Sequence, residues 1–165
     1  KALTSYLLGD KAVKSSGQLT LNPFKYIDFI GFICMLSWGY GWGKNVETNN
    51  SYYKDRKKGN LITYTMPIIL NILFAIIFYN LKSLWSWFSI IGHLNLGLAI
   101  FNLIPIYPLC GERILRYFLN PNSSIKYMQI EPTIRVLVIL FIAMGYLPVA
   151  LNFVINLIEN IITLF

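Results

Sequence analysis

The sequence predicts an all-α membrane protein with about four transmembrane helices and a short re-entrant strand or hairpin segment near its N-terminus. Of its 165 residues, 56% are hydrophobic and 13% are charged, a more apolar composition than that of ordinary soluble domains. The apolar residues are grouped in blocks that approach the roughly 20 residues needed to cross a bilayer. The basic residues fall mainly in the connections between these blocks, as expected for a membrane protein.

The length fits a single polytopic membrane domain, residues 1–165. The apolar blocks predict spans near 27–43, 61–80, 87–109 and 134–158. The last block contains Gly145 and Pro148, so we expect a kink there.

Residues 1–26 are expected to form the re-entrant segment. Polar and apolar residues alternate over 18–22, and Pro23, which cannot donate to a β-ladder, ends the pattern. Non-helical backbone survives at membrane depth only where protein or water covers it, so a polar cavity is expected beside this segment. The opening residues lack the continuous apolar core of a signal peptide, and Lys1 in place of methionine indicates a processed or truncated start.

The distribution of charge predicts the orientation in a cell membrane and the partners. Connections 44–60 and 111–133 carry most of the basic residues between spans, and we expect both to be cytoplasmic. The net charge of +7 is divided among these connections, so we expect the lipid bilayer rather than nucleic acid as a partner. Cys34 and Cys110 lie in or at the end of apolar blocks, which argues against a secreted disulfide framework.

A few polar residues lie within the predicted spans. Asn95 and Asn102 are spaced to share one helical face, where they would either form hydrogen bonds between helices or line a substrate cleft. His93 falls nearly opposite Asn102 and has no histidine or carboxylate three or four residues onward. We therefore expect His93 not to bind a metal.

Five fragments in order resemble one known family. They are "LLGD" (7–10), "GQLTLNP" (17–23), "YIDFIGF" (26–32), "GWGK" (41–44) and "FNLIPIYPLCG" (101–111). Each is weak alone, but their order and spacing resemble the bacterial branch of the site-2 protease family of membrane-embedded zinc metalloproteases. The resemblance covers residues 1 to about 120.

The resemblance implies zinc-dependent proteolysis of transmembrane substrates within the membrane. The family binds zinc through two histidines of an H-E-x-x-H helix and an aspartate of a later L-D-G motif, and the glutamate activates a zinc-bound water. Here Lys1 stands at the position of the second histidine, and the first histidine and the glutamate would precede residue 1. Cys110, in "PLCGER", stands at the position of the aspartate.

These replacements imply a degenerate zinc site in a chain whose N-terminal part is missing. Lysine has no acceptor lone pair when charged, so we expect Lys1 not to bind zinc. A Cys110 thiolate can bind zinc, but one ligand does not hold a catalytic ion, and Cys110 can equally be a small buried apolar residue. We therefore expect no bound zinc and assign no catalytic residue.

Further residues can be aligned with the family's second span and the connection before it. In "TMPIILN" the family's proline and asparagine remain as Pro67 and Asn71, whereas Met66 replaces a glycine. Asn71 thus joins Asn95 and Asn102 as an expected cleft-lining residue. Asn45 replaces the proline that follows the "GWGK" lysine in the family.

Three functions remain open at this point. The chain is an inactive or fragmentary member that binds transmembrane segments of other proteins, or an active protease that combines Cys110 with upstream ligands. A small membrane transporter or scaffold is the third possibility, and it is suggested only by the intramembrane asparagines and His93.

Overall fold

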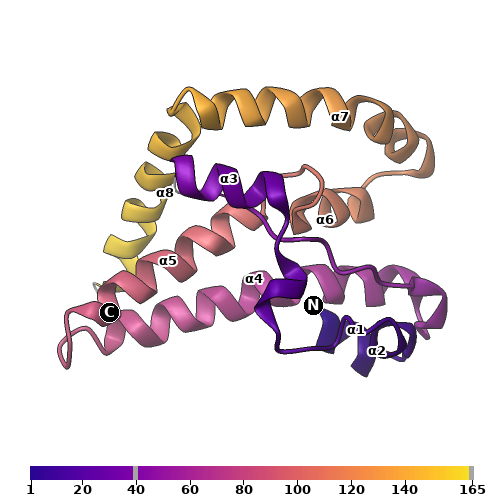
Figure 1. The fold of residues 1–165 in the computed structure, drawn as a ribbon, viewed down its shortest axis with the longest axis horizontal. Coiled ribbons are helices and arrows are strands. Elements are labelled where there is room, and N and C mark those ends of the chain that lie inside the picture. The colour runs from indigo at the N-terminus through magenta and orange to yellow at the C-terminus, as the bar shows by residue number, and fades with distance from the viewer. Residues whose placement is uncertain (39–40, 164–165) are drawn as a thin grey trace.

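The computed structural model describes residues 1–38 and 41–163, whose regular elements are helices with no β-strand, so the all-α class is confirmed (Figure 1). The helices are α1 (Ala2–Leu7), α2 (Ala12–Ser15), η1 (Pro23–Tyr26), α3 (Phe29–Trp38), η2 (Asn50–Tyr52), α4 (Arg56–Asn80), α5 (Trp87–Asn102), α6 (Cys110–Phe118), α7 (Pro121–Ala143) and α8 (Tyr146–Thr163). The expected span at 27–43 includes residues 39 and 40, which lie outside the described residues.

The described helices confirm one or two membrane-span candidates and not four. α4, with 25 residues, is long and apolar enough to cross a bilayer, and α7 with α8 passes the same test as a pair bent by 81°. The bend lies at Gly145, whose φ of +79° favours glycine, as the sequence predicted. α5 has 16 residues and ends at Asn102, before Pro105 and Pro108, which cannot supply backbone N–H groups to a continuing helix.

The prediction of a strand or hairpin within residues 18–26 is wrong. The Asn22 side chain accepts from the Phe24 amide, and the Asn22 amide donates to Thr20 Oγ1, so local turns replace a ladder. The Tyr26 hydroxyl donates to the Gln18 carbonyl and closes this loop on itself. An isolated antiparallel bridge joins Ile27 to Gly43 on either side of α3.

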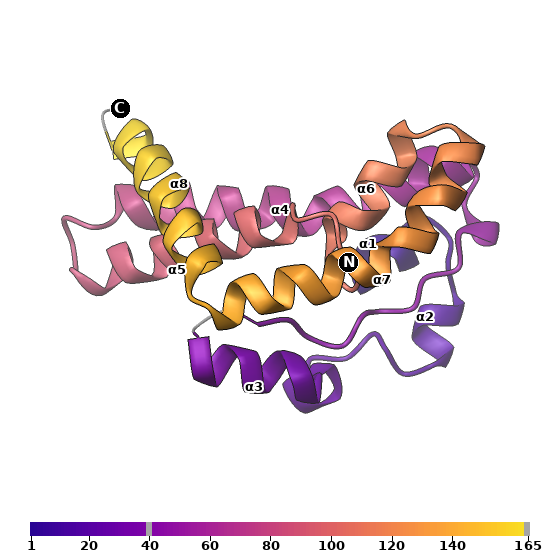
Figure 2. The same cartoon turned by 90° about the horizontal axis from the view of Figure 1, so that it is seen from above.

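α4 and α5 pack side by side, with α4 along the lower edge of the view in Figure 1, and α6 and α8 also contact α4. α3 contacts α7, and Figure 2 shows these two helices next to each other, with α3 away from α4. The main apolar core consists of side chains from α4, α5, α7, α8 and the connection before α6: Ala75, Tyr79, Leu96, Phe101, Ile106, Leu109, Ile142, Leu151 and Ile155.

Much of the apolar surface remains uncovered. In the most apolar window of α4, 22% of the residues are buried, whereas the core helix of a soluble protein is mostly buried. Large side chains such as Ile69, Leu73 and Phe74 are 47–49% exposed on this helix. Continuous exposed apolar surface of this kind is rare on soluble monomers and suits contact with lipid.

Candidate functional site

The corner between α5 and α6 places Cys110. Pro105 and Pro108 lie in this connection, and the peptide bond between Tyr107 and Pro108 is cis. Leu109 precedes the first turn of α6, and Cys110 is the first residue of that helix. The Cys110 side chain packs with Tyr64, Ile68 and Ala99, and the residue is 4% exposed.

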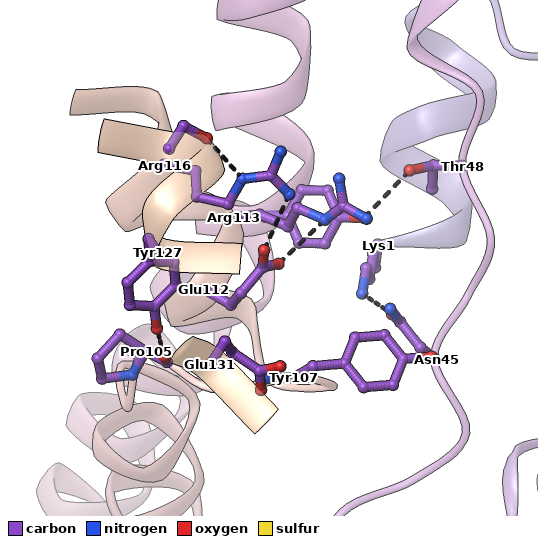
Figure 3. Close-up of polar contacts among 12 residues, drawn as sticks. Lys1, Asn45, Thr48, Pro105, Tyr107, Glu112, Arg113, Arg116, Tyr127 and Glu131 are labelled. Atoms are coloured by element: carbon purple, nitrogen blue, oxygen red, sulfur yellow. Dashed lines mark hydrogen bonds and ion pairs between the residues drawn. The ribbon is translucent and has the colours of Figure 1, made fainter. Parts of the chain in front are cut away.

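Residues of α7 hold this corner. The Tyr107 amide donates to Glu131 Oε1 at 2.8 Å, and Arg135 donates to Glu131 Oε2 at 3.1 Å. The Tyr127 hydroxyl donates to the Pro105 carbonyl (Figure 3). Glu131 is buried and its charge is paired, so it can order the corner from α7.

Lys1 and Cys110 line the same cavity. This cavity has a volume of about 270 Å³ and is lined by residues 1, 41–46, 67, 98, 101, 102 and 108–110. It therefore brings together the two positions that align with zinc ligands of the resembling family. Asn45, Pro67 and Asn102 lie around the same space.

The Lys1 ammonium group is held within this region by two partners. It donates to Asn45 Oδ1 (Figure 3), and it lies 4.3 Å from the centroid of the Tyr64 ring, within cation–π distance. Burial lowers the pKa of the Lys1 ammonium to about 8, while attraction to Cys110 opposes this change and repulsion by Arg113 adds to it. Burial raises the pKa of the Cys110 thiol, and the Lys1 charge opposes that rise.

The lowered pKa of Lys1 predicts a dependence of stability on pH. The unfolded chain binds more protons than the folded chain between about pH 8, the folded pKa, and pH 10.5, the unfolded value. The cost of the buried ammonium is therefore fully present below pH 8 and disappears as the pH rises to 10.5. We expect Lys1→Met to be more stable than Lys1→Arg by a margin that is independent of pH, because arginine stays charged throughout.

The wild type provides the measurement. At pH 7 we expect its free energy of unfolding to lie near that of Lys1→Arg, and at pH 10.5 to have gained about 1–2 kcal/mol on both variants. Chemical unfolding of the three proteins at a series of pH values measures this. A wild-type curve parallel to that of Lys1→Arg would contradict a buried, titrating lysine.

The polar groups of this cavity do not fit a catalytic zinc. A catalytic zinc requires three protein ligands and an open position. A charged Lys1 offers no lone pair, and Cys110 offers one sulfur. Among the described residues, no group of three His, Cys, Asp or Glu side chains is placed to hold a metal ion. Lys1 and Cys110 therefore do not reproduce the ligands that the family has at these two positions, and no catalytic step through zinc follows from them.

The structure separates the three asparagines. Asn102 lines the cavity, and its amide donates to the Leu98 carbonyl one turn earlier in α5. Asn95 likewise donates to the Ile91 carbonyl of its own helix. Asn71 is half-buried on α4, one turn beyond Pro67. A cleft-lining role for Asn71 and Asn95 stays a prediction.

Two polar partners were missed from the sequence. His93 Nδ1 lies 3.2 Å from Glu159 Oε2, which joins α5 to α8. Glu112, 6% exposed, pairs with both Arg113 and Arg116 (Figure 3). An ionisable residue in an apolar block is a signal for a polar partner, and His93, within the block 87–109, carried that signal. The partner itself depends on long-range packing.

Two known proteins that are similar in sequence to this chain are both named as zinc metalloproteases. The chain is 35% identical over 146 residues to "Putative zinc metalloprotease YwhC" of Bacillus subtilis, an alignment that covers 79% of this chain and 67% of that protein. It is 24% identical over 137 residues to "Putative zinc metalloprotease Rip2" of Mycolicibacterium smegmatis, covering 74% of this chain and 52% of Rip2.

The chain thus spans about two thirds of YwhC and about half of Rip2. No family model matches the chain, and no solved structure does. The identity to YwhC, over most of this chain and two thirds of its relative, agrees with the ordered fragments from "LLGD" to "FNLIPIYPLCG". The chain therefore belongs to the site-2 protease family.

Proposed function

We propose that this chain is an inactive member of the site-2 protease family that binds transmembrane segments of other membrane proteins without cutting them. The observation that carries the proposal is the pair of side chains at the aligned ligand positions. Lys1 brings a cation to the cavity, and Cys110 brings a single thiol. This set lacks the three ligands that a catalytic zinc needs, so we expect the chain to bind no zinc.

The Lys1 ammonium also gives a physical reason for the cavity to persist without metal. Zinc in the family would supply positive charge at this position. The Lys1 ammonium supplies a positive charge in the same cavity, with Asn45 and the Tyr64 ring as partners. A fixed cation of this kind can orient the carbonyl groups of a bound peptide segment, but it cannot activate a water as a Lewis acid does.

The size of the cavity limits how a partner would bind. At about 270 Å³ it is smaller than most sites that enclose a drug-sized ligand, so it would hold a side chain or a short unwound piece of a partner. The rest of the partner would lie against the exposed apolar surface of the helices. The lipid bilayer and transmembrane segments are thus the expected partners, and nucleic acid is not.

The family and the apolar surface support a location in the cell membrane. α4 alone is a clear span candidate, and α7 with α8 supplies a bent second one. We propose a multi-pass arrangement in which connections 44–60 and 111–133 face the cytoplasm, because these connections carry the basic residues that favour the inner side.

The test is zinc content and cleavage measured on the intact protein, including any residues that precede Lys1. Elemental analysis after purification without chelators is expected to give well below one zinc ion per chain. A transmembrane reporter peptide in the same vesicles is expected to remain uncut. A photo-crosslinking residue at position 102, which lines the cavity, is expected to capture the reporter. The same residue at position 94, 60% exposed on the same helix, serves as the control.

Stoichiometric zinc together with cleavage would overturn the proposal. If that cleavage were lost in Cys110→Ala, the active alternative, in which Cys110 acts with upstream ligands, would replace it. Cleavage that survives Cys110→Ala would exclude Cys110 as a ligand. Equal crosslinking from positions 94 and 102 would show that the cavity does not select the bound segment.

A further inference from the structure

A second polar cavity lies at the end of the molecule where α4 and α7 begin. Its volume is about 270 Å³, and four of its lining residues are basic: Arg56 and Lys57 from the first turn of α4, and Arg113 and Arg116 from α6. Figure 1 shows the start of α4, α6 and the start of α7 at the same end of the molecule, and Figure 2 agrees. Neither Lys1 nor Cys110 lines this cavity.

The positive charge of this cavity is only partly neutralised by protein. Glu112 pairs with both Arg113, at 3.1 Å, and Arg116, at 3.0 Å, so one carboxylate faces two guanidinium groups. Among the described residues, no carboxylate lies within ion-pair distance of Arg56 or Lys57. Asp55, nearby, caps the Lys57 and Lys58 amides and pairs with Lys58 instead.

The remaining donors suit a phosphate group. Glu112 and Ser124 fix the Arg116 guanidinium, because Arg116 donates to Glu112 Oε1 and to Ser124 Oγ, at 3.0 and 2.9 Å. Asn50, Asn60 and Ser124 add neutral donors to the lining. Preoriented arginines with several neutral donors are the arrangement that binds phosphate oxygens in proteins.

The surroundings favour a lipid as the source of this phosphate. Asn60 lines the cavity and directly precedes Leu61, where the apolar part of α4 begins in the sequence. Leu119 lines the cavity, and Phe118, Ile125 and Met128, which are near the lining residues Leu119 and Ser124 in the sequence, are 51–72% exposed. A headgroup in the cavity would thus leave its acyl chains against an apolar surface.

From these contacts we propose that the cavity between the starts of α4 and α7 and helix α6 binds the phosphate of an anionic phospholipid headgroup. The site does not depend on proteolysis or on the Lys1 and Cys110 cavity. It would hold the cytoplasmic end of α4 at the membrane surface. The same donors could bind free phosphate, so the experiment distinguishes a lipid headgroup from free phosphate as the ligand.

The test uses the full chain in an uncharged detergent, titrated with short-chain phosphatidylglycerol, phosphatidylcholine or inorganic phosphate, with binding followed by native mass spectrometry and thermal shift. Arg56→Gln with Lys57→Gln removes the two cations that lack a carboxylate partner. Lys54→Gln with Lys58→Gln is the matched control, because it removes the same charge from the same connection outside the cavity lining. All four side chains are exposed, so we expect both variants to fold.

Phosphatidylglycerol is expected to bind more tightly than phosphatidylcholine. Its affinity should fall about tenfold in the Arg56 and Lys57 variant and stay near wild type in the control. If inorganic phosphate binds as tightly as the lipid and is lost in the same variant, the phosphate site stands and the lipid source is overturned. Equal losses in both variants, or no preference for the anionic lipid, would overturn the site.

Discussion

Replacing Glu112 with alanine is expected to lower the free energy of unfolding by about 3 kcal/mol. Glu112 is 6% exposed and pairs with Arg113 and Arg116, whose side chains are 39% and 23% exposed. Removal of the carboxylate would leave two guanidinium groups close together without their common partner. Because both can still reach some solvent, we expect the lower part of the 3–5 kcal/mol range for broken buried ion pairs.

The position of Glu112 increases this effect. It lies in the first turn of α6, where the helix dipole favours a negative charge, and it directly follows Cys110 and Gly111. Arg113 Nε lies 3.1 Å from Glu112 Oε2, but the geometry of that contact does not make a hydrogen bond. The Arg116 contact is therefore the better ordered of the two.

Chemical unfolding in an uncharged detergent measures the effect. Asp55→Asn is the matched control, because its ion pair with Lys58 is 3.8 Å long and solvent-exposed, and asparagine still caps α4. We expect this control to change stability by no more than about 0.5 kcal/mol. An equally small change for Glu112→Ala would mean that the two guanidinium groups separate and are solvated without the carboxylate. Glu112 would then not be needed to position them.

The sequence predicted the helical class and the apolar segments better than the lengths of the helices. Alternation over 18–22 resembles a strand, but Thr20 and Asn22 form hydrogen bonds locally and turn the chain. The third apolar block continues to Leu109, whereas α5 stops at Asn102 because two prolines follow. Hydropathy does not register where a helix loses its hydrogen-bond donors, so it overestimates the length of such segments.

The sequence identified the two aligned positions of the candidate site but not the partners that surround them. Family motifs identified Lys1 and Cys110, and the structure places both on one cavity. Asn45 and Tyr64 hold the Lys1 ammonium from distant parts of the chain, and no local pattern marks them as its partners. The same holds for Glu131, which reaches the corner from α7.

Gly111 is required by the packing of the corner between α5 and α6 rather than by its own backbone conformation. Among the described glycines, it is Gly9, Gly17 and Gly145 that have positive φ, and Gly111 is not one of them. A Cβ atom at Gly111 would lie 2.2 Å from the Leu103 carbonyl oxygen and 2.5 Å from that of Ile104. The close approach of two backbone segments, rather than an unusual φ, is what requires glycine there.

Gly111→Ala is accordingly expected to cost about 3 kcal/mol, the upper end for an overpacked site, because the obstructing atoms are backbone and cannot rotate away. Gly97→Ala on α5 is the matched control. Its Cβ would meet only the flexible end of Ile155 at 3.3 Å, while alanine improves helix propensity by about 1 kcal/mol, so a neutral or stabilising effect is expected. Chemical unfolding compares the two variants. Equal stabilities would mean that the connection between α5 and α6 can shift to accommodate the added methyl group. The close backbone approach would then not fix the position of Cys110.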